Sequence, residues 1–183
     1  MRFLNKILFV FGVFFAFETS AYDGIADWWN ELKDNTAKTW NDGRVAAYIP
    51  VNTWHNRLTY DRKKIDSYNE SPYGFGLGKY RYDEDGNWHS LYVMGFKDSN
   101  YHLETIFGYA YQHNWYFDEE KNWRFGAGYT LSLTQRAESL MIPLPLPLPV
   151  ASFGYKYFSV QAAYVPGVKN DGNVLFTWLR VDF

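Results

Sequence analysis

Histidine is the side chain best suited to proton transfer near neutral pH, and this chain has four. Taken alone, His55 fits an ordinary polar position on a strand, and the other three fit interfacial or loop positions: His89, His102 and His113. The chain has no cysteine, which excludes thiol chemistry and disulfides. No spacing of acidic residues and histidines suggests a metal site. We therefore expect no metal or other cofactor, and the residue types alone do not single out one histidine as a base.

The composition indicates a membrane barrel. Aromatic residues make up 21% of the chain, including eight Trp and sixteen Tyr. The mean hydropathy is nevertheless only −0.40. Girdles of aromatic rings at both membrane interfaces, combined with a polar lumen, give this combination in transmembrane barrels. The formal net charge of −2 argues against a nucleic-acid partner.

The last eleven residues show the strand pattern most clearly. Leu175, Leu179 and Val181 alternate with Phe176, Trp178 and Arg180, and the chain stops on Phe183. A strand has a side-chain period of two, so this is a strand with one apolar and one mixed face. Eight such segments occur, near 46–60, 73–82, 88–98, 104–116, 123–134, 148–157, 158–165 and 173–183. We therefore predict an all-β, eight-stranded, antiparallel up-and-down outer-membrane barrel over 43–183.

The region before the barrel divides into two parts. Residues 1–21 resemble a secretory signal with a basic start, an apolar run of eleven and a cleavage site after Ala21. Residues 22–42 place Trp28, Trp29, Leu32 and Trp40 near helical spacing. This pattern favours an amphipathic helix on the membrane surface, and the alternative is a soluble helix packed on a core. The signal-like segment together with the predicted barrel leads us to expect that the protein is exported to the bacterial outer membrane.

Small residues gather on the presumed inner face of three strands. They are Gly74, Gly76, Gly78, Gly108, Ala110, Gly126 and Gly128. The side chains of an eight-stranded barrel normally fill its lumen. Small residues in place of larger side chains on three strands would therefore leave a slender cavity. The alternative is that these glycines only ease the coiling of the strands. The pattern leaves both interpretations open.

Prolines fall where they would interrupt pairing between strands. Pro50 and Pro166 lie in or at the end of predicted strands, Pro72 lies just before one, and four more alternate with leucine from Pro143 to Pro149. Proline has no amide hydrogen, so it weakens a hydrogen-bonded seam. Such seams would admit lipid sideways. The alternative is a set of rim and turn prolines outside the hydrocarbon region.

Several motifs in order resemble the lipid A palmitoyltransferase (PagP) family. The resemblance runs from about residue 27 to residue 183 without obvious gaps. It rests on Tyr48–Arg57 (YIPVNTWHNR), Tyr60-Asp61, Tyr68-Asn-Glu70, Gly86–His89 (GNWH), Phe96–Ser99 (FKDS), Ile142–Pro145 (IPLP), Val165-Pro-Gly167 and Gly172-Asn-Val174. Each motif alone is weak, and their order makes the resemblance specific.

The resemblance implies a barrel enzyme that moves a palmitoyl chain from a glycerophospholipid to lipid A, as a monomer or homodimer. The family's essential residues correspond to His55, Asp98 and Ser99. Its lipopolysaccharide-recognition residues correspond to Lys64 and Arg136, and its acyl pocket to Gly108, Ala110, Gly126 and Gly128. Its lateral lipid gates correspond to Pro50, Pro72, Pro149 and Pro166, with Lys169 beside the last. Family members carry glycine where this chain has Ala110, and an aromatic residue is more familiar at Lys169.

Two questions stay open at the level of sequence. Asp98 and Ser99 are consecutive, so both serve one site only if the strand has already given way to a loop. They act either with a histidine base in acyl transfer or in binding a lipid head group. The rival functions are a lipid A deacylase or outer-membrane phospholipase, and a non-enzymatic structural barrel.

Overall fold

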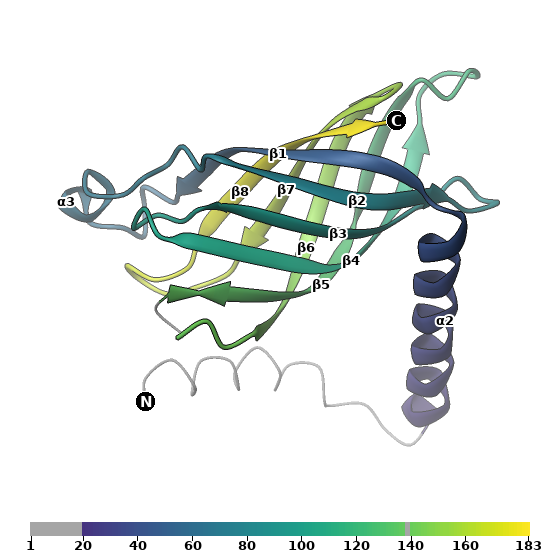
Figure 1. Cartoon of the computed structure of the whole chain (residues 1–183), viewed down its shortest axis with the longest axis horizontal. Helices are drawn as coiled ribbons and strands as arrows, with labels where there is room; N and C mark the ends of the chain where they lie inside the picture. The colour runs from purple at the N-terminus through teal and green to yellow at the C-terminus, as the bar shows by residue number, and fades with distance from the viewer. Residues whose placement is uncertain (1–19, 138–139) are drawn as a thin grey trace. The chain divides into compact units, whose positions relative to one another are not determined.

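Eight antiparallel strands close into a barrel in the computed structural model, which describes residues 20–137 and 140–183. Neighbours in sequence are neighbours in the sheet, and β1 closes the barrel against β8 (Figure 1). The strands are β1 (Arg44–His55), β2 (Gly74–Tyr82), β3 (Trp88–Lys97), β4 (Leu103–Tyr116), β5 (Trp123–Arg136), β6 (Leu144–Tyr155), β7 (Phe158–Val165) and β8 (Val174–Asp182). The predicted fold class is confirmed.

Two predicted strand boundaries are wrong by four or more residues. The first strand ends at His55 rather than at residue 60, because Asn56 accepts the backbone N–H groups of Thr59 and Tyr60 and turns the chain. The sixth strand begins at Leu144 rather than at residue 148. Prolines in its first half face outward and leave the inward-facing leucines in strand register with β5.

The helix before the barrel, α2 (Ser20–Asp42), contains the predicted range 22–42. Its three tryptophans, Trp28, Trp29 and Trp40, are exposed. Neither α2 nor the single-turn α3 (Arg62–Ile65) is long and apolar enough to cross a bilayer. The predicted signal falls almost entirely on residues 1–19, which lie outside the described residues.

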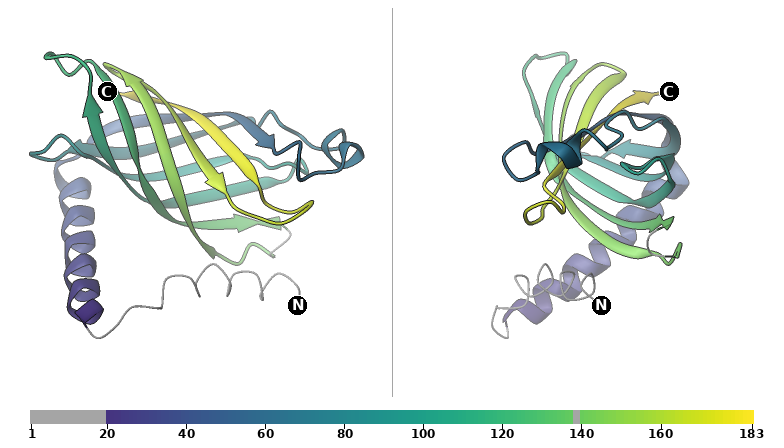
Figure 2. Two further views of the ribbon diagram at one scale, coloured as in Figure 1. Left: turned by 180° about the vertical axis from the view of Figure 1, so that it is seen from behind. Right: turned by 90° about the vertical axis from the view of Figure 1, so that its left-hand side faces the viewer.

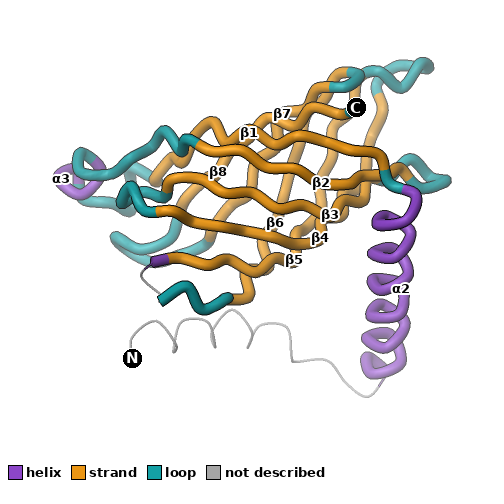
Figure 3. Tube along the Cα trace, viewed as in Figure 1, coloured by secondary structure: helices purple, strands orange, loops and turns teal. Residues whose placement is uncertain are grey.

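The two ends of the barrel differ in the connections between their strands. The long loop 56–73, which carries α3, lies at the same end as the connections 98–102 and 166–173 (Figure 2). The short turns 83–87, 117–122 and 156–157 lie at the other end, together with the end of β8 (Figure 3). We call these the loop end and the turn end.

Side chains alternate between the lumen and the outside of the barrel. Outward positions are rich in exposed apolar residues, among them Val45, Trp54, Leu77, Val93, Phe107, Trp115, Phe125, Phe153 and Leu179. A soluble monomer rarely exposes so much contiguous apolar surface, whereas a barrel in lipid requires it. The alternation read from the last strand is confirmed, since Trp178 and Arg180 are buried and Leu179 is exposed.

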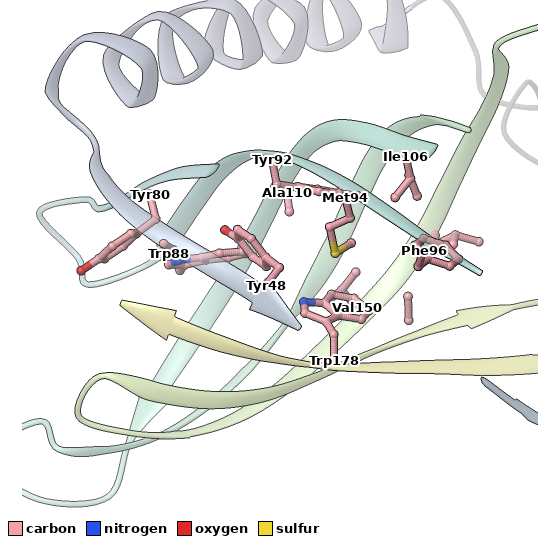
Figure 4. Packing of buried hydrophobic residues seen from close by; sticks show 13 residues of the cluster. Tyr48, Tyr80, Trp88, Tyr92, Met94, Phe96, Ile106, Ala110, Val150 and Trp178 are labelled. Carbon is pink, nitrogen blue, oxygen red and sulfur yellow. The ribbon is translucent and has the colours of Figure 1, made fainter. Parts of the chain in front are cut away.

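The loop-end half of the lumen is lined by apolar side chains. Met94 and Phe96 from β3, Ile106 from β4 and Val150 from β6 pack into one buried cluster with Trp178 (Figure 4). Phe176 completes it by stacking on Phe96, with ring centroids 4.7 Å apart. This half of the lumen suits an apolar chain.

Hydrogen-bonded hydroxyl groups form a polar layer on the turn-end side of these residues, and the two tyrosines that contribute to it, Tyr48 and Tyr92, belong to the same cluster. Tyr48 Oη is 2.6 Å from Ser90 Oγ, and Tyr92 Oη is 2.7 Å from Thr130 Oγ1. Further toward the turn end the lumen holds a buried ion pair, in which Arg180 Nε lies 2.8 Å from Asp182 Oδ1. The lumen therefore changes from apolar to charged along its axis.

Two seams in the barrel wall lack strand pairing at the loop end. Within the described chain, β6 pairs with β7 from Val150 to Tyr155, so the proline-bearing half of β6 has only β5 beside it. Similarly, β1 pairs with β2 from Arg44 to Tyr48, and the pairing ends two residues before Pro50. Both seams therefore begin beside a proline.

Candidate active site

The site begins with a hydrogen bond between a serine and a buried histidine at the loop end. Ser99 Oγ lies 3.0 Å from His55 Nε2. His55 is the last residue of β1 and is only 2% exposed. Since β3 ends at Lys97, Asp98 and Ser99 lie in the turn beyond it, which meets the condition set by the sequence for both to serve one site.

A glutamate that the sequence analysis did not select occupies the other side of the imidazole. Glu70 Oε1 lies 3.0 Å from His55 Nδ1, and the same oxygen accepts the backbone N–H of His55 at 3.0 Å. A carboxylate only accepts hydrogen bonds, so Nδ1 carries the hydrogen and Nε2 is left to accept one from Ser99. The order is therefore Ser99 to His55 to Glu70, the arrangement of a nucleophile, a base and an orienting acid.

Arg57 holds the carboxylate of Glu70 in place. Its two terminal nitrogens, Nη1 and Nη2, each lie 2.5 Å from one carboxylate oxygen of Glu70. Such a two-point contact fixes both the position and the plane of the carboxylate. The hydrogen bond from Arg57 is the main reason that the pKa of Glu70 falls to about 2. The carboxylate is thus ionised at any physiological pH.

Asn69 joins the segment that carries Glu70 to the turn that carries Ser99. Its backbone N–H donates to Ser99 O at 2.9 Å, and its side-chain amide donates to Asp98 O at 3.2 Å. On the other side, Thr53 N donates to Glu70 O at 3.0 Å. The only sequence signal for this arrangement was the Tyr68-Asn-Glu70 motif, which carried the resemblance without a role for its residues.

Asp98 has a different place from Ser99. One of its carboxylate oxygens, Oδ1, accepts the backbone N–H groups of Asn100 and His102, each at 2.8 Å. Its other oxygen faces Arg136 Nη2 at 4.0 Å. The side chain is buried and holds the turn in shape. The contacts to His55 come from Ser99 and Glu70, so a catalytic role of Asp98 stays a prediction.

The two residues assigned to lipopolysaccharide recognition both contact other loop-end groups. Lys64 Nζ donates to Asn170 O at 2.6 Å and lies over the rings of Tyr60 and Tyr68. Arg136 Nε lies 3.2 Å from Glu104 Oε2. Lys64 therefore joins two loops, whereas Arg136 joins the loop ends of β5 and β4, and the role of both residues toward lipid A stays a prediction.

Aromatic rings cover the histidine. The Tyr68 ring lies 4.6 Å from the imidazole of His55 and the Tyr60 ring lies 5.1 Å from it. Tyr60 is itself fixed by donating its hydroxyl to Gly172 O at 2.6 Å. This shell keeps water from much of the imidazole and strengthens the polar contacts inside it.

The four residues predicted for the acyl pocket have different surroundings. Ala110 is buried in the apolar cluster (Figure 4), with Gly108 one inward position nearer the loop end. A methyl at Gly126 would instead meet the polar side chains of Asn114, Gln112 and Ser152, outside the apolar half. At Gly108 and Gly128 an added carbon would meet the backbone of a neighbouring strand, so close strand approach explains both glycines.

The predicted gate prolines lie along the two unpaired seams. Pro50 lies in β1 and Pro72 two residues before β2, whereas Pro149 lies in β6 and Pro166 directly follows β7. Lys169 lies in the loop 166–173, which follows β7. Its Nζ is 3.6 Å from Asp61 Oδ1, and this contact links that loop to the loop 56–73. Passage of lipid through these seams stays a prediction.

A separate cavity opens at the turn end, far from the histidine along the barrel axis. Its volume is about 560 Å³, and its lining includes Arg44, Arg124, Lys121, Glu84 and Asp182. A charged lining does not suit an acyl chain. Among the described residues, no group of three or more acidic, histidine or cysteine side chains could hold a metal ion.

Comparisons with known proteins agree with this architecture. The family model described as "Antimicrobial peptide resistance and lipid A acylation protein PagP" matches residues 35–180. A protein of Yersinia pseudotuberculosis named lipid A acyltransferase PagP is 57% identical over 155 residues, which cover 85% of this chain and 77% of that protein.

Relatives of the same name occur in other genera. The Proteus mirabilis protein is 53% identical over 154 residues, covering 84% of this chain and 73% of its own length. The Photorhabdus laumondii protein is 52% identical over 152 residues, covering 83% and 73%. Identity at this level over most of both chains shows a shared family. The chain belongs to the PagP family.

Proposed function

We propose that this protein is an outer-membrane lipid A acyltransferase that moves a palmitoyl chain from a glycerophospholipid to a hydroxyl of lipid A. The observation that carries the proposal is the hydrogen bond between Ser99 and His55 at the mouth of an apolar lumen. Relatives named lipid A acyltransferase PagP support the reaction and the acceptor. The apolar exterior of the barrel supports a place in a membrane.

The geometry suits acyl transfer through a covalent intermediate. Ser99 Oγ attacks the carbonyl carbon of the donor ester while its proton passes to His55 Nε2. Collapse of the tetrahedral intermediate breaks the ester bond, and the departing lysophospholipid oxygen takes the proton from His55. A lipid A hydroxyl then attacks the acyl-serine by the same route in reverse. The acyl chain extends into the apolar half of the lumen during both steps.

The seams give the two lipids separate routes to one site. Proline cannot donate a hydrogen bond to a neighbouring strand, so the wall beside the outward-facing Pro149 and the buried Pro50 separates at a smaller cost than a paired wall. Both seams lie at the loop end, where His55 and Ser99 lie. An acyl chain can thus move from the bilayer into the lumen without crossing water.

The test is mass spectrometry of lipid A incubated with a radiolabelled phospholipid and either the purified protein or its Ser99→Ala variant. A gain of one palmitoyl group with the intact protein, and no gain with the variant, supports the proposal. Loss of an acyl chain would instead indicate a deacylase. An unchanged lipid A spectrum with folded protein would refute acyl transfer. Heat-modifiable migration in gels shows that each barrel is folded.

A further inference from the structure

We propose that Glu70 is the positioning residue for the histidine base, and that Asp98 shapes the turn without taking part in the relay. The relay is then Ser99, His55 and Glu70. This inference rests on the proposed acyl transfer and assigns the third member of its site. Glu70 touches neither substrate nor reacting atoms, and it acts through His55.

One oxygen of Glu70 fixes the histidine twice. Oε1 accepts the ring hydrogen on Nδ1 and the backbone N–H of the same residue, both at 3.0 Å. The backbone contact fixes where His55 stands, and the ring contact fixes the direction and tautomer of the imidazole. Nε2 is thereby aimed at Ser99 Oγ at 3.0 Å. The same carboxylate stabilises the imidazolium that forms when Ser99 gives up its proton.

The charges around the imidazole favour this role. Arg57, Lys64 and Glu70 are the charged groups that face it, with the rings of Tyr60 and Tyr68 packed against it. Glu70 is the single carboxylate among these five groups. With its pKa at about 2 it stays ionised across the pH range in which a histidine titrates. Its side chain is 23% exposed, so water weakens the interaction only in part.

The contacts of Asp98 are those of a structural residue. It accepts the backbone N–H groups of Asn100 and His102, and this closes the turn in which Ser99 lies. Tyr101, inside this turn, has a φ of 63°, a left-handed conformation that the turn must hold in place. Loss of Asp98 would therefore displace Ser99 without changing the electrostatics of His55 directly.

Steady-state kinetics from pH 4 to pH 10 separate the two roles. Glu70→Gln should lower kcat by about 10²–10⁴-fold with KM within about threefold of the original, because the amide neither fixes the productive tautomer nor stabilises the imidazolium. The acidic limb of its pH–rate profile should move to lower pH, since a positive imidazole is less favoured without the carboxylate. Glu70→Asp keeps the charge and should recover part of kcat. Asp98→Asn should lower activity without moving the limb.

Glu119→Gln is the matched control, because Glu119 is exposed in the loop between β4 and β5 at the turn end. It makes the same chemical change and should leave the profile unaltered. A folded Glu70→Gln protein with the original kcat and an unmoved acidic limb would overturn the proposal. A shift of the limb in Asp98→Asn but not in Glu70→Gln would overturn it as well.

A measurement without substrate separates this inference from the proposed function. Imidazole ¹⁵N chemical shifts in micelles report the tautomer of each histidine, with His55→Asn identifying the signal of His55. We expect the Nδ1–H form in the original protein and its loss in Glu70→Gln. An unchanged tautomer would refute the role of Glu70. An inactive original protein that shows the expected tautomers would refute the acyltransferase function and leave the geometric role of Glu70 intact.

Discussion

Replacing Ala110 by glycine should lengthen the acyl chain that the enzyme prefers. Ala110 is 4% exposed, and its methyl group points into the lumen. Its register partners are Ser90 and Thr130, whose hydroxyls are held by Tyr48 and Tyr92. The methyl thus lies where the apolar cluster meets the polar layer. Because Ser90 and Thr130 are held by hydrogen bonds, their side chains move little when the end of an acyl chain approaches them.

The size of the effect follows from the volume of one methyl group. Burying one more methylene is worth about 0.8 kcal/mol, or roughly fourfold in kcat/KM between consecutive chain lengths. Forcing it into the filled site costs about 1–3 kcal/mol, or roughly 5- to 160-fold. Ala110→Gly should therefore move the optimum by about one methylene toward the longer donor. The loss of stability, about 0.5–1 kcal/mol, leaves the barrel folded.

The assay offers phosphatidylcholines of graded acyl length, odd and even, to both proteins and compares kcat/KM at each length. Ala127→Gly is the control, because Ala127 faces outward on β5 and the same change there leaves the lumen intact. Superimposable length profiles of the original protein and Ala110→Gly would show that another residue sets the floor. A shift in the control as well would attribute the effect to strand flexibility.

His55→Ala should lower transfer by about 10²–10⁴-fold while the barrel still migrates as a folded protein, and full activity would refute the site assignment. Cysteines at Pro149 and Tyr164, which continue the register just past the last β6–β7 pair, should slow turnover when oxidised and recover on reduction; an unchanged rate would place lipid entry elsewhere. Arg180→Met removes one partner of the buried Asp182 and should cost about 3–5 kcal/mol in denaturant unfolding, and an unaltered midpoint would contradict that pairing.

Much of the architecture is local in origin and was therefore predictable. A side-chain period of two appears in the sequence wherever one strand face meets lipid and the other the lumen, so eight strands could be counted. Turn signals such as Asp83–Asn87 mark where they end. The boundaries that failed depend on tertiary context. The first half of β6 tolerates its prolines because it pairs with β5 alone, so no hydrogen bond to β7 is needed there. The pattern within a single strand does not reveal which of its edges is paired.

The sequence by itself determined the eight-stranded barrel and the family resemblance, and the resemblance selected His55, Asp98 and Ser99 as site residues with their individual roles open. Only the tertiary structure decided which carboxylate contacts the histidine. Asp98 is next to Ser99 in the chain, yet its oxygen is taken up by the backbone of its own turn. Glu70 lies fifteen residues beyond His55 and reaches it because Asn69 fastens the loop 56–73 to that turn. Proximity in a folded barrel is set by how strands and loops close, and sequence separation does not record it.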